Sequence, residues 1–331
     1  MGIGMICFGL YIHNNRADFR LRENGDSNQY SESNPTEANP ALSHFISIDK
    51  KLDSFSQDDK NLVDYVRLRY LTPPSHRPYP IESTSLAKER NRKANPFGDF
   101  VATKNGKFID ASCGNMTDVL LTSPTLNLER KLSWEGIVIG CNPFTVPSLK
   151  LNRRNSWVAE VCLSRKNTPH RMHMTFSTNG HQHEDDDPKP SQPSKLSLFQ
   201  IMKPSSPISN NTEIHYENQR VETVEVQAVP LFSVISAVGW NEVDFLSLEM
   251  KGYEMDILKN IPWDKVTFKV MQVGIFTYNE KELAELDEYL ELYDYMLVKD
   301  RVQDKYRVYV HMSISDIIYE KPGAYASLTS K

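Results

Sequence analysis

The stretch FIDASCGNMTD, residues 108–118, starts as a buried strand, FID, and runs into a polar loop, ASCGN. In a parallel α/β sheet, the loop after the first strand usually holds glycines, because the backbone there must approach a cofactor closely. Here the loop has one glycine, Gly114, with Ser112, Cys113 and Met116 around it. The stretch therefore predicts either a cofactor loop or the remnant of one.

Outward from this strand, buried strands alternate with helices along the chain. Expected strands lie at 107–111, 135–143, 156–164, 243–250 and 268–276, with an alternating strand at 221–229 and a closing strand at 307–313. Expected helices lie at 123–134, 144–155, 230–239, 251–263 and 280–295. This alternation predicts an α/β fold with a doubly wound, mostly parallel sheet. The last strand is expected to close the sheet in the antiparallel direction.

The regions outside this core differ from it in composition. In chain order they are an apolar start (1–12), a disordered stem (13–55), a helix with a proline-rich lead-in (56–99), a polar, disordered insertion in the core (177–220) and a tail (316–331). Low hydrophobicity is what predicts disorder in the stem and the insertion. The lead-in helix is expected at 56–71, with Ser56 as its N-cap.

The apolar start, MGIGMICFGLYI, has three open interpretations. It is too short to span a bilayer, which takes about 20 apolar residues, and it lacks the basic start of a signal peptide. It fits the clipped end of a signal anchor, a weakly membrane-associated segment, or an ordinary apolar N-terminus.

The composition excludes some classes of function. The chain has 331 residues and a formal net charge of −5, which argues against nucleic acid as the main partner. Four cysteines are too few and too scattered for a disulfide scaffold or a zinc cluster: Cys7, Cys113, Cys141 and Cys162. Four histidines lie near the acidic run EDDD: His170, His173, His181 and His183. A solvated loop explains them better than a metal site, because metal ligands need a rigid frame.

Five segments carry a family resemblance. In chain order they are LTPPSHRPYPI, GKFIDA, LNLERKLSWEGIVI, NRRNSWVAEVCLS and VDFLSLEMKGYEMDILKNIPWDKV. Together they resemble the FkbM-type methyltransferase family and, within it, the arthropod Star and Star-like proteins. The resemblance covers about residues 58–315. It implies a Rossmann-like, S-adenosylmethionine-dependent methyltransferase fold over residues 100–315.

The resemblance implies a cofactor loop that this chain keeps only in part. The family's first loop follows an acid and a small residue, here Asp110 and Ala111, and it contains two glycines. Ser112 stands in place of the first glycine and Met116 in place of the second. Gly114 would compensate if the register shifts.

The other positions that the resemblance implies are also altered. At the end of the second strand the family has a glutamate that accepts hydrogen bonds from the ribose, and here Gly140 replaces it, with Asn142 in the same motif. Loss of such a charged partner costs about 1.5–3 kcal/mol. At the family's later acids, Glu249 keeps a carboxylate, Lys251 reverses the charge and Gly274 has no side chain.

These substitutions fall at strand ends that face one crevice, while the framework between them is kept. The framework residues include Trp134, Gly136, Cys162 and Trp263. We interpret the crevice as a vestigial cofactor site made of Asp110, Ser112, Gly114, Gly140 and Asn142. No residue is assigned as catalytic or metal-binding, although Glu249 and Lys251 stand at family acid positions. A misaligned loop would explain Met116 but not Gly140 or Lys251.

Two sequons and two cysteines bear on the compartment. Asn115 and Asn210 each begin an N-glycosylation sequon, and a glycan on Asn115 would block a cofactor pocket. Cys113 and Cys141 lie at the ends of the first two expected strands, which would be neighbours in this fold. They form a disulfide in an oxidising lumen or, in the favoured interpretation, remain two free buried thiols.

The resemblance implies a non-catalytic, Star-like protein of the endoplasmic reticulum, Golgi and endosomal membranes, with its domain in the lumen. Its implied partner is a membrane-anchored growth-factor precursor, such as an EGF-receptor ligand precursor, which it escorts from endoplasmic reticulum to Golgi. Membrane attachment would come from an N-terminal anchor, of which residues 1–12 are the clipped end in one of the three interpretations above. No cofactor is expected.

Two alternatives remain. One is an active S-adenosylmethionine-dependent O-methyltransferase in which Asp110, Gly114 and Glu249 carry the cofactor and acid–base roles. The other is a soluble cytoplasmic paralogue, which applies if residues 1–12 are the true start.

Overall fold

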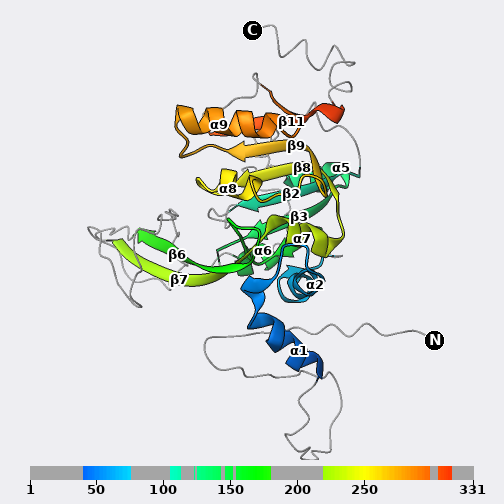
Figure 1. Ribbon diagram of the computed structural model, residues 1–331, viewed down its shortest axis with the longest axis vertical. Helices are drawn as coiled ribbons and strands as arrows, with labels where there is room; N and C mark the ends of the chain where they lie inside the picture. The colour runs from blue at the N-terminus through cyan, green and yellow to red at the C-terminus, as the bar shows by residue number, and fades with distance from the viewer. Residues whose placement is uncertain are drawn as a thin grey trace, which may run out of the picture. The chain divides into compact units, whose positions relative to one another are not determined.

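Figure 1 shows the protein as a computed structural model. The structure describes residues 40–75, 105–112, 123, 125–142, 146–151, 154–179, 219–298 and 305–314. The chain divides into two compact units, residues 1–50 and residues 51–331. Both sheets and the candidate site belong to the second unit.

The disordered stem expected over 13–55 is wrong from residue 40 onward. Helix α1 (Pro40–Asp49) forms there, and a 3-10 helix, η1 (Leu52–Ser54), follows it. Proline occupies the first helical position, where its missing N–H needs no partner. Apolar residues recur at helical spacing in PALSHFISID, a local pattern that the polar average of the whole segment hides. Residues 13–39 lie outside the described residues.

Among the described residues, the main sheet has eight strands. Their order is β1 (Leu71–Thr72), β4 (Trp157–Ala159), β3 (Glu135–Gly140), β2 (Lys107–Ser112), β8 (Glu242–Glu249), β9 (Thr267–Gly274), β11 (Tyr306–His311) and β10 (Tyr295–Leu297). The strands from β4 to β9 are parallel, whereas β1, β11 and β10 pair in the antiparallel direction. Strand β2 lies at the centre, between β3 and β8 (Figure 1). The parallel core and the antiparallel closing strand β11 are confirmed, and β10 is an additional edge strand.

A second sheet has three strands, in the order β5 (Cys162–Leu163), β7 (Gln219–Val229) and β6 (His170–Asn179). The single strand expected over 156–164 is therefore wrong, because β4 lies in the main sheet and β5 in the small one. The break falls at Glu160, whose N–H donates to the Tyr70 carbonyl at 2.9 Å and whose carboxylate pairs with Lys150. A charged side chain inside an apolar run marks the point at which the chain changes sheets.

Strand β6 pairs with β7 along all ten of its residues. Residues 177–179 and 219–220, the two ends of the insertion expected at 177–220, therefore lie in paired strands and not in a disordered segment. Met172, Met174 and Phe176 alternate with polar residues, which is the period of a strand. The rest of the insertion, residues 180–218, lies outside the described residues.

The described part of the second unit contains the helices α2 (Lys60–Arg69), α5 (Leu126–Leu132), α6 (Val146–Leu151), α7 (Leu231–Val238), α8 (Glu254–Leu258) and α9 (Glu280–Glu291). Each expected helix is present but shorter than its predicted range. Helix α2 starts late because Asp59, not Ser56, caps it, with its carboxylate accepting the Asn61 N–H at 2.7 Å. Helix α9 begins with a capping box formed by Asn279 and Glu282.

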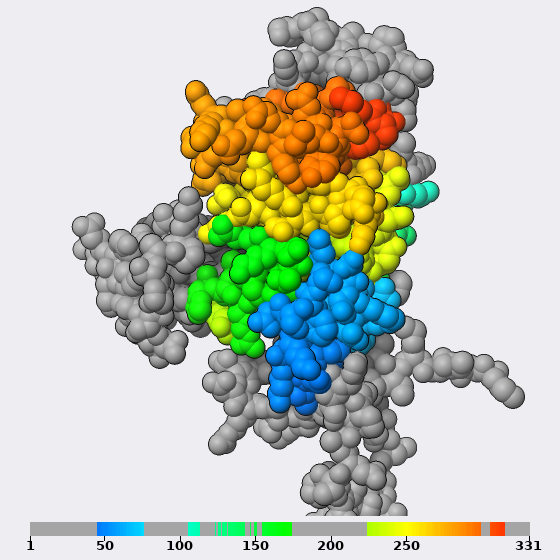
Figure 2. All heavy atoms as spheres, in the orientation of Figure 1, coloured from blue at the N-terminus to red at the C-terminus, as the bar shows by residue number. Residues whose placement is uncertain are grey.

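The central strands of the main sheet bury large apolar side chains, among them Phe108 and Phe245. Gly136 on β3 permits one close approach, since a Cβ atom there would lie 2.0 Å from Cζ of Phe108. No side chain fits in that space, so this glycine sets how closely the Phe108 ring approaches β3. Figure 2 shows that the segments from β8 onward, yellow to red, form a continuous surface on this face.

Several sequence expectations fall on residues outside the described ranges. They are the apolar start (1–12), most of the proline-rich lead-in (76–99), the loop residues Cys113, Gly114, Asn115 and Met116, the sequon at Asn210 and the tail (316–331). Among the described residues, no helix combines the length and apolar character needed to cross a membrane.

Candidate functional site

The site positions chosen from the sequence gather at the carboxyl edge of the main sheet. Ser112, at the end of β2, lies opposite Gly140 of β3 on one side and Glu249 of β8 on the other. Gly274 ends β9, which pairs with β8. The structure therefore brings these four positions together along one edge of four neighbouring strands.

Glu249 keeps its carboxylate, and neighbouring side chains engage both of its oxygens. The Lys251 ammonium lies 2.8 Å from Oε1, and the Tyr306 hydroxyl donates to Oε2 at 3.0 Å. Burial and the nearby Glu249 charge raise the pKa of Tyr306, so its phenol stays protonated and remains a donor. Lys251 is thus the counterion of Glu249.

The ring of Phe276 occupies the space beside Lys251 and Tyr306. Lys251 Nζ lies 3.6 Å from the ring centroid, and the Tyr306 ring packs against it edge-on at 5.2 Å. A Cβ atom added at Gly274 would lie 3.1 Å from the same ring and 3.3 Å from Glu254 Oε1. A side chain at this position would therefore require Phe276 and Glu254 to shift by a few tenths of an ångström.

Glu254, at the start of α8, is a site residue that the sequence analysis missed. Its side chain is fully buried, and its two carboxylate oxygens accept the N–H groups of Met250 at 2.7 Å and Gly252 at 2.9 Å. Burial raises the pKa of this carboxyl. The two bonds hold a turn in which Lys251 and Gly252 have φ angles of 55° and 105°. The Gly-x-Glu spacing before a helix is the signal that could have revealed it.

Asp110, the acid expected at the cofactor loop, is only 5% exposed and is bonded within the protein. Its Oδ2 accepts hydrogen bonds from Ser123 Oγ at 2.6 Å and from Thr125 Oγ1 at 2.9 Å. Arg154 donates to the same two hydroxyl oxygens, at 3.0 Å each. Asp110 thus lies in β2, two residues before the end of the strand, and its carboxylate is part of a buried polar network.

Arg154 extends this network into a buried ion pair that the sequence analysis also missed. Its Nε lies 2.8 Å from Glu129 Oε2, and neither side chain is exposed. Glu129 also accepts a hydrogen bond from Ser156 Oγ at 2.7 Å and from the Asn155 N–H at 2.5 Å. Buried charges are tolerated when further hydrogen bonds satisfy them, as they do here. No sequence spacing links α5 to the start of β4, because only the fold brings them together.

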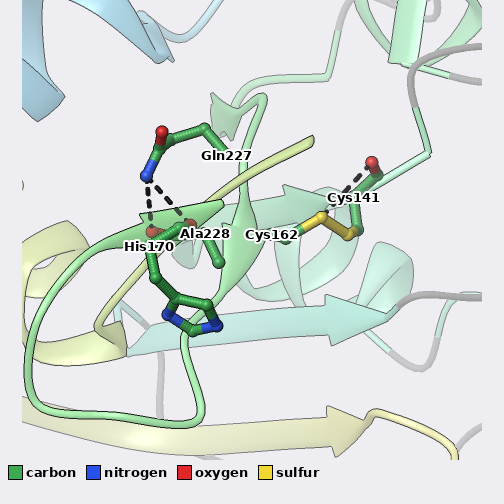
Figure 3. The surroundings of a disulfide bond; sticks show 5 residues. All are labelled: Cys141, Cys162, His170, Gln227 and Ala228. Atoms are coloured by element: carbon green, nitrogen blue, oxygen red, sulfur yellow. Dashed lines mark hydrogen bonds between the residues drawn. A yellow bond between two sulfur atoms is a disulfide. The ribbon is translucent and has the colours of Figure 1, made fainter. Parts of the chain in front are cut away.

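A disulfide joins Cys141, which follows β3, to Cys162 in β5, with the Cα atoms 4.3 Å apart (Figure 3). The favoured expectation of free thiols is therefore wrong for Cys141, and the alternative pairing of Cys141 with Cys113 is also wrong. The cause is the break after β4: β4 pairs with β3, and the chain then returns past the end of β3. Asn142, from the expected cofactor site, follows the disulfide and is buried.

The small sheet continues beside the disulfide. Gln227 Nε2 donates to the carbonyl oxygen of His170 at 3.0 Å (Figure 3). His170 Nδ1 lies 2.9 Å from Ser164 Oγ, and burial lowers the pKa of this imidazole. Within the described ranges, no three His, Cys, Asp or Glu side chains are grouped as a metal site requires.

Comparison with known proteins adds a family assignment. The family model of the methyltransferase FkbM domain matches residues 102–297. This range is more than half of the chain, and it contains all four strands whose carboxyl ends form the candidate site. No curated protein matches the chain.

Proposed function

This chain belongs to the methyltransferase FkbM family, and from that premise we propose that it is a non-catalytic, Star-like member whose domain binds a protein partner. In this proposal the fold is Rossmann-like and doubly wound, which the central position of β2 between β3 and β8 supports. The domain needs no cofactor.

The filled carboxyl edge carries this proposal. In open α/β sheets, ligands bind in a crevice outside the carboxyl ends of the strands. At this edge Glu249 is paired with Lys251 and Tyr306, and Phe276 lies against Gly274. A methyl acceptor that used the Glu249 carboxylate would have to compete with Lys251 and Tyr306 for its oxygens.

The disulfide supports a place in the secretory pathway, because disulfides persist in oxidising compartments. The proposed location is the endoplasmic reticulum, Golgi and endosomal membranes, with the domain in the lumen and an N-terminal anchor in the membrane. The resemblance to Star-like proteins suggests the partner, a membrane-anchored growth-factor precursor that is escorted from endoplasmic reticulum to Golgi.

One observation favours the alternative, an active S-adenosylmethionine-dependent O-methyltransferase. Glu249 keeps a carboxylate at the end of β8, and its Oε2 accepts a hydrogen bond from the Tyr306 hydroxyl. Tyr306 would then be a second group for acid–base chemistry. In that case Asp110, Gly114 and Glu249 would carry the cofactor and acid–base roles.

Isothermal titration of S-adenosylmethionine into the purified full-length chain separates the two. We expect no binding up to millimolar cofactor from a sample that circular dichroism shows to be folded. S-adenosylhomocysteine serves as the second probe, because it lacks the transferable methyl group. Micromolar binding of either would contradict the non-catalytic proposal.

Co-expression with a membrane-anchored EGF-receptor ligand precursor tests the partner. We expect the two proteins to co-purify from detergent-solubilised membranes. A soluble form of the same ligand, without its membrane anchor, is the matched control. Failure to co-purify with the precursor, together with measurable methyl transfer, would overturn the proposal.

A further inference from the structure

Strand β6 is an outer strand of the small sheet, and it is long. It pairs with β7 along all ten residues of His170–Asn179, and no other strand pairs with it among the described residues. The outer strands of the main sheet, β1 and β10, have only two and three residues. A long outer strand presents a row of backbone N–H and C=O groups with which another strand can pair.

Among the described residues, the small sheet has only two strands over most of its length. Strand β5 pairs with β7 only at Ala228 and Val229, so β6 and β7 continue side by side as a two-stranded ribbon (Figure 1). Two strands alone are at best marginally stable in water, whereas three or more strands with an apolar face are stable. One further strand on β6 would therefore stabilise the ribbon.

The ribbon has one apolar face and one polar face. Met172 lies opposite Val226, and Val224 shares their face because side chains alternate along a strand. All three are half-buried, so the described residues leave this apolar face partly exposed. Arg171 and Glu225 lie on the opposite face, where they form an exposed ion pair at 2.8 Å.

Strand β6 lacks the features that keep outer strands from pairing. Such strands commonly carry lysine, proline, an inward-pointing charge or a bulge. The sequence HRMHMTFSTN has no lysine, proline or acid, and its pairing with β7 runs without a bulge. Its one arginine, Arg171, is paired with Glu225. Strand β7 carries two glutamates, Glu222 and Glu225, so β6 is the edge better suited to pairing.

Strand β6 is also complementary to itself. In an antiparallel pair of two β6 strands centred on Met174, this residue lies opposite its own copy, and Met172 lies opposite Phe176 of the second copy. Arg171 lies opposite the neutral Ser177, so its charge does not meet a like charge across the axis. A register shifted by one residue would place the apolar face of one strand beside the polar face of the other.

We propose that two copies of this chain pair through β6, in the antiparallel direction, about a two-fold axis at Met174. The two ribbons then form one four-stranded sheet in the order β7-β6-β6-β7, with their apolar faces side by side. A two-fold interface of this kind uses the same surface of both copies. The proposal rests on the small sheet alone, so it is independent of whether the carboxyl edge of the main sheet binds a cofactor.

Size-exclusion chromatography with light scattering of the full-length chain tests the proposal. We expect twice the mass of one chain at micromolar concentration. Met174→Lys and Met174→Glu should each weaken the dimer roughly tenfold or more, because like charges then meet at the axis. An equimolar mixture of the two variants should recover the dimer, because a positive charge then faces a negative one.

The mixture is also the matched control for folding, since variants that only unfold do not recover when they are mixed. A monomeric wild type, a dimer that neither variant weakens, or folded variants that stay monomeric when mixed would overturn the proposal. A wild type that is monomeric alone but binds the membrane-anchored precursor, in a complex that Met174→Lys abolishes, would assign β6 to that partner and overturn self-pairing.

Cross-linking tests the register. Facing Cβ atoms in an antiparallel pair lie about 4.5–5.5 Å apart, so Met174→Cys should form a disulfide between two copies under mild oxidation. Thr175→Cys is the matched control, because its own copy lies two residues further along the opposite strand, too far for a disulfide. We expect roughly tenfold less linked dimer in Thr175→Cys. Equal linkage of the two variants, or no linkage of Met174→Cys, would overturn the proposed pairing.

Discussion

At the scale of single residues, the turn after β8 depends on the buried carboxylate of Glu254. It accepts the N–H groups of Met250 and Gly252, and so holds Lys251 where it pairs with Glu249. Burial makes the charged form of such a carboxyl costly, which is why its pKa is raised. The position of Lys251 beside Glu249 is therefore linked to the protonation of Glu254.

This linkage gives a pH prediction for Glu254→Gln. Because the folded pKa lies above the ordinary value of 4.5, the native state holds a proton that the unfolded state loses as the pH rises through that range. Protonation of Glu254 therefore contributes its full share to the free energy of unfolding below pH 4.5. This contribution is lost as the pH rises from 4.5 to the raised pKa of Glu254. The free energy of unfolding of wild type, relative to Glu254→Gln, should fall by about 1.4 kcal/mol per pKa unit of the shift.

Urea denaturation of both proteins from pH 4 to pH 8 measures this difference. Glu288→Gln, on the exposed face of α9, should show a flat difference from wild type over the same range. If the free energy of unfolding of wild type relative to Glu254→Gln instead rises with pH, the raised pKa assigned to Glu254 is wrong.

Restoring the family acid with Gly274→Glu should destabilise the fold. The new Cβ would lie 3.1 Å from Phe276, and overpacking of a filled site costs about 1–3 kcal/mol. Urea denaturation measures the loss. The double variant Gly274→Glu/Phe276→Ala should be more stable than the sum of the two single changes predicts, because the ring no longer blocks the acid. Full additivity would show that Phe276 does not fill this position.

At the scale of elements, long apolar runs made β2, β3, β8 and β9 predictable from the sequence. Their ends also placed Ser112, Gly140, Glu249 and Gly274 at one edge, because the carboxyl ends of parallel strands meet there. Strands β5 and β6 were not predicted, since β5 has two residues and β6 has only three apolar residues, in alternation with polar ones. The position of the Phe276 ring beside Lys251 and Gly274 could not be predicted from the sequence, because it depends on side-chain contacts.

The ion pair between α5 and the segment before β4 gives the prediction at this scale. Arg154→Met leaves the Glu129 charge buried without its partner, and we expect a loss of about 3–5 kcal/mol in the free energy of unfolding. The double variant Arg154→Met/Glu129→Leu should recover much of that loss, because no unpaired charge remains. Urea denaturation of wild type, the single variant and the double variant measures these changes in the free energy of unfolding. A single variant as stable as wild type would rule out a paired, buried Arg154.

At the scale of the whole molecule, the disulfide connects the main sheet to the small sheet. The sequence resemblance was enough to predict the family domain, which the match over 102–297 confirms. It was not enough to pair the cysteines, because the pairing depends on where the chain returns after β4. Cys141 and Cys162 are 21 residues apart, so the bond closes a short loop in the unfolded chain.

Loss of this bond should lower the stability of the second unit. A disulfide that closes a loop of this length is worth about 3 kcal/mol. We expect that loss in Cys141→Ser, and no further loss in Cys141→Ser/Cys162→Ser, because either change removes the same bond. Thermal unfolding without reductant measures it, and peptide mapping should recover the linked peptides. Additive losses, or the two cysteines recovered as free thiols, would contradict the pairing.

The two edges of the main sheet have a consequence for association between molecules. The sheet ends in β1 and β10, which have two and three residues, whereas its inner strands have up to eight. A short edge strand offers few open backbone groups to a strand from another chain. Among the described residues, both outer strands of this sheet therefore present little backbone for pairing with a strand of another molecule, which limits edge-to-edge association.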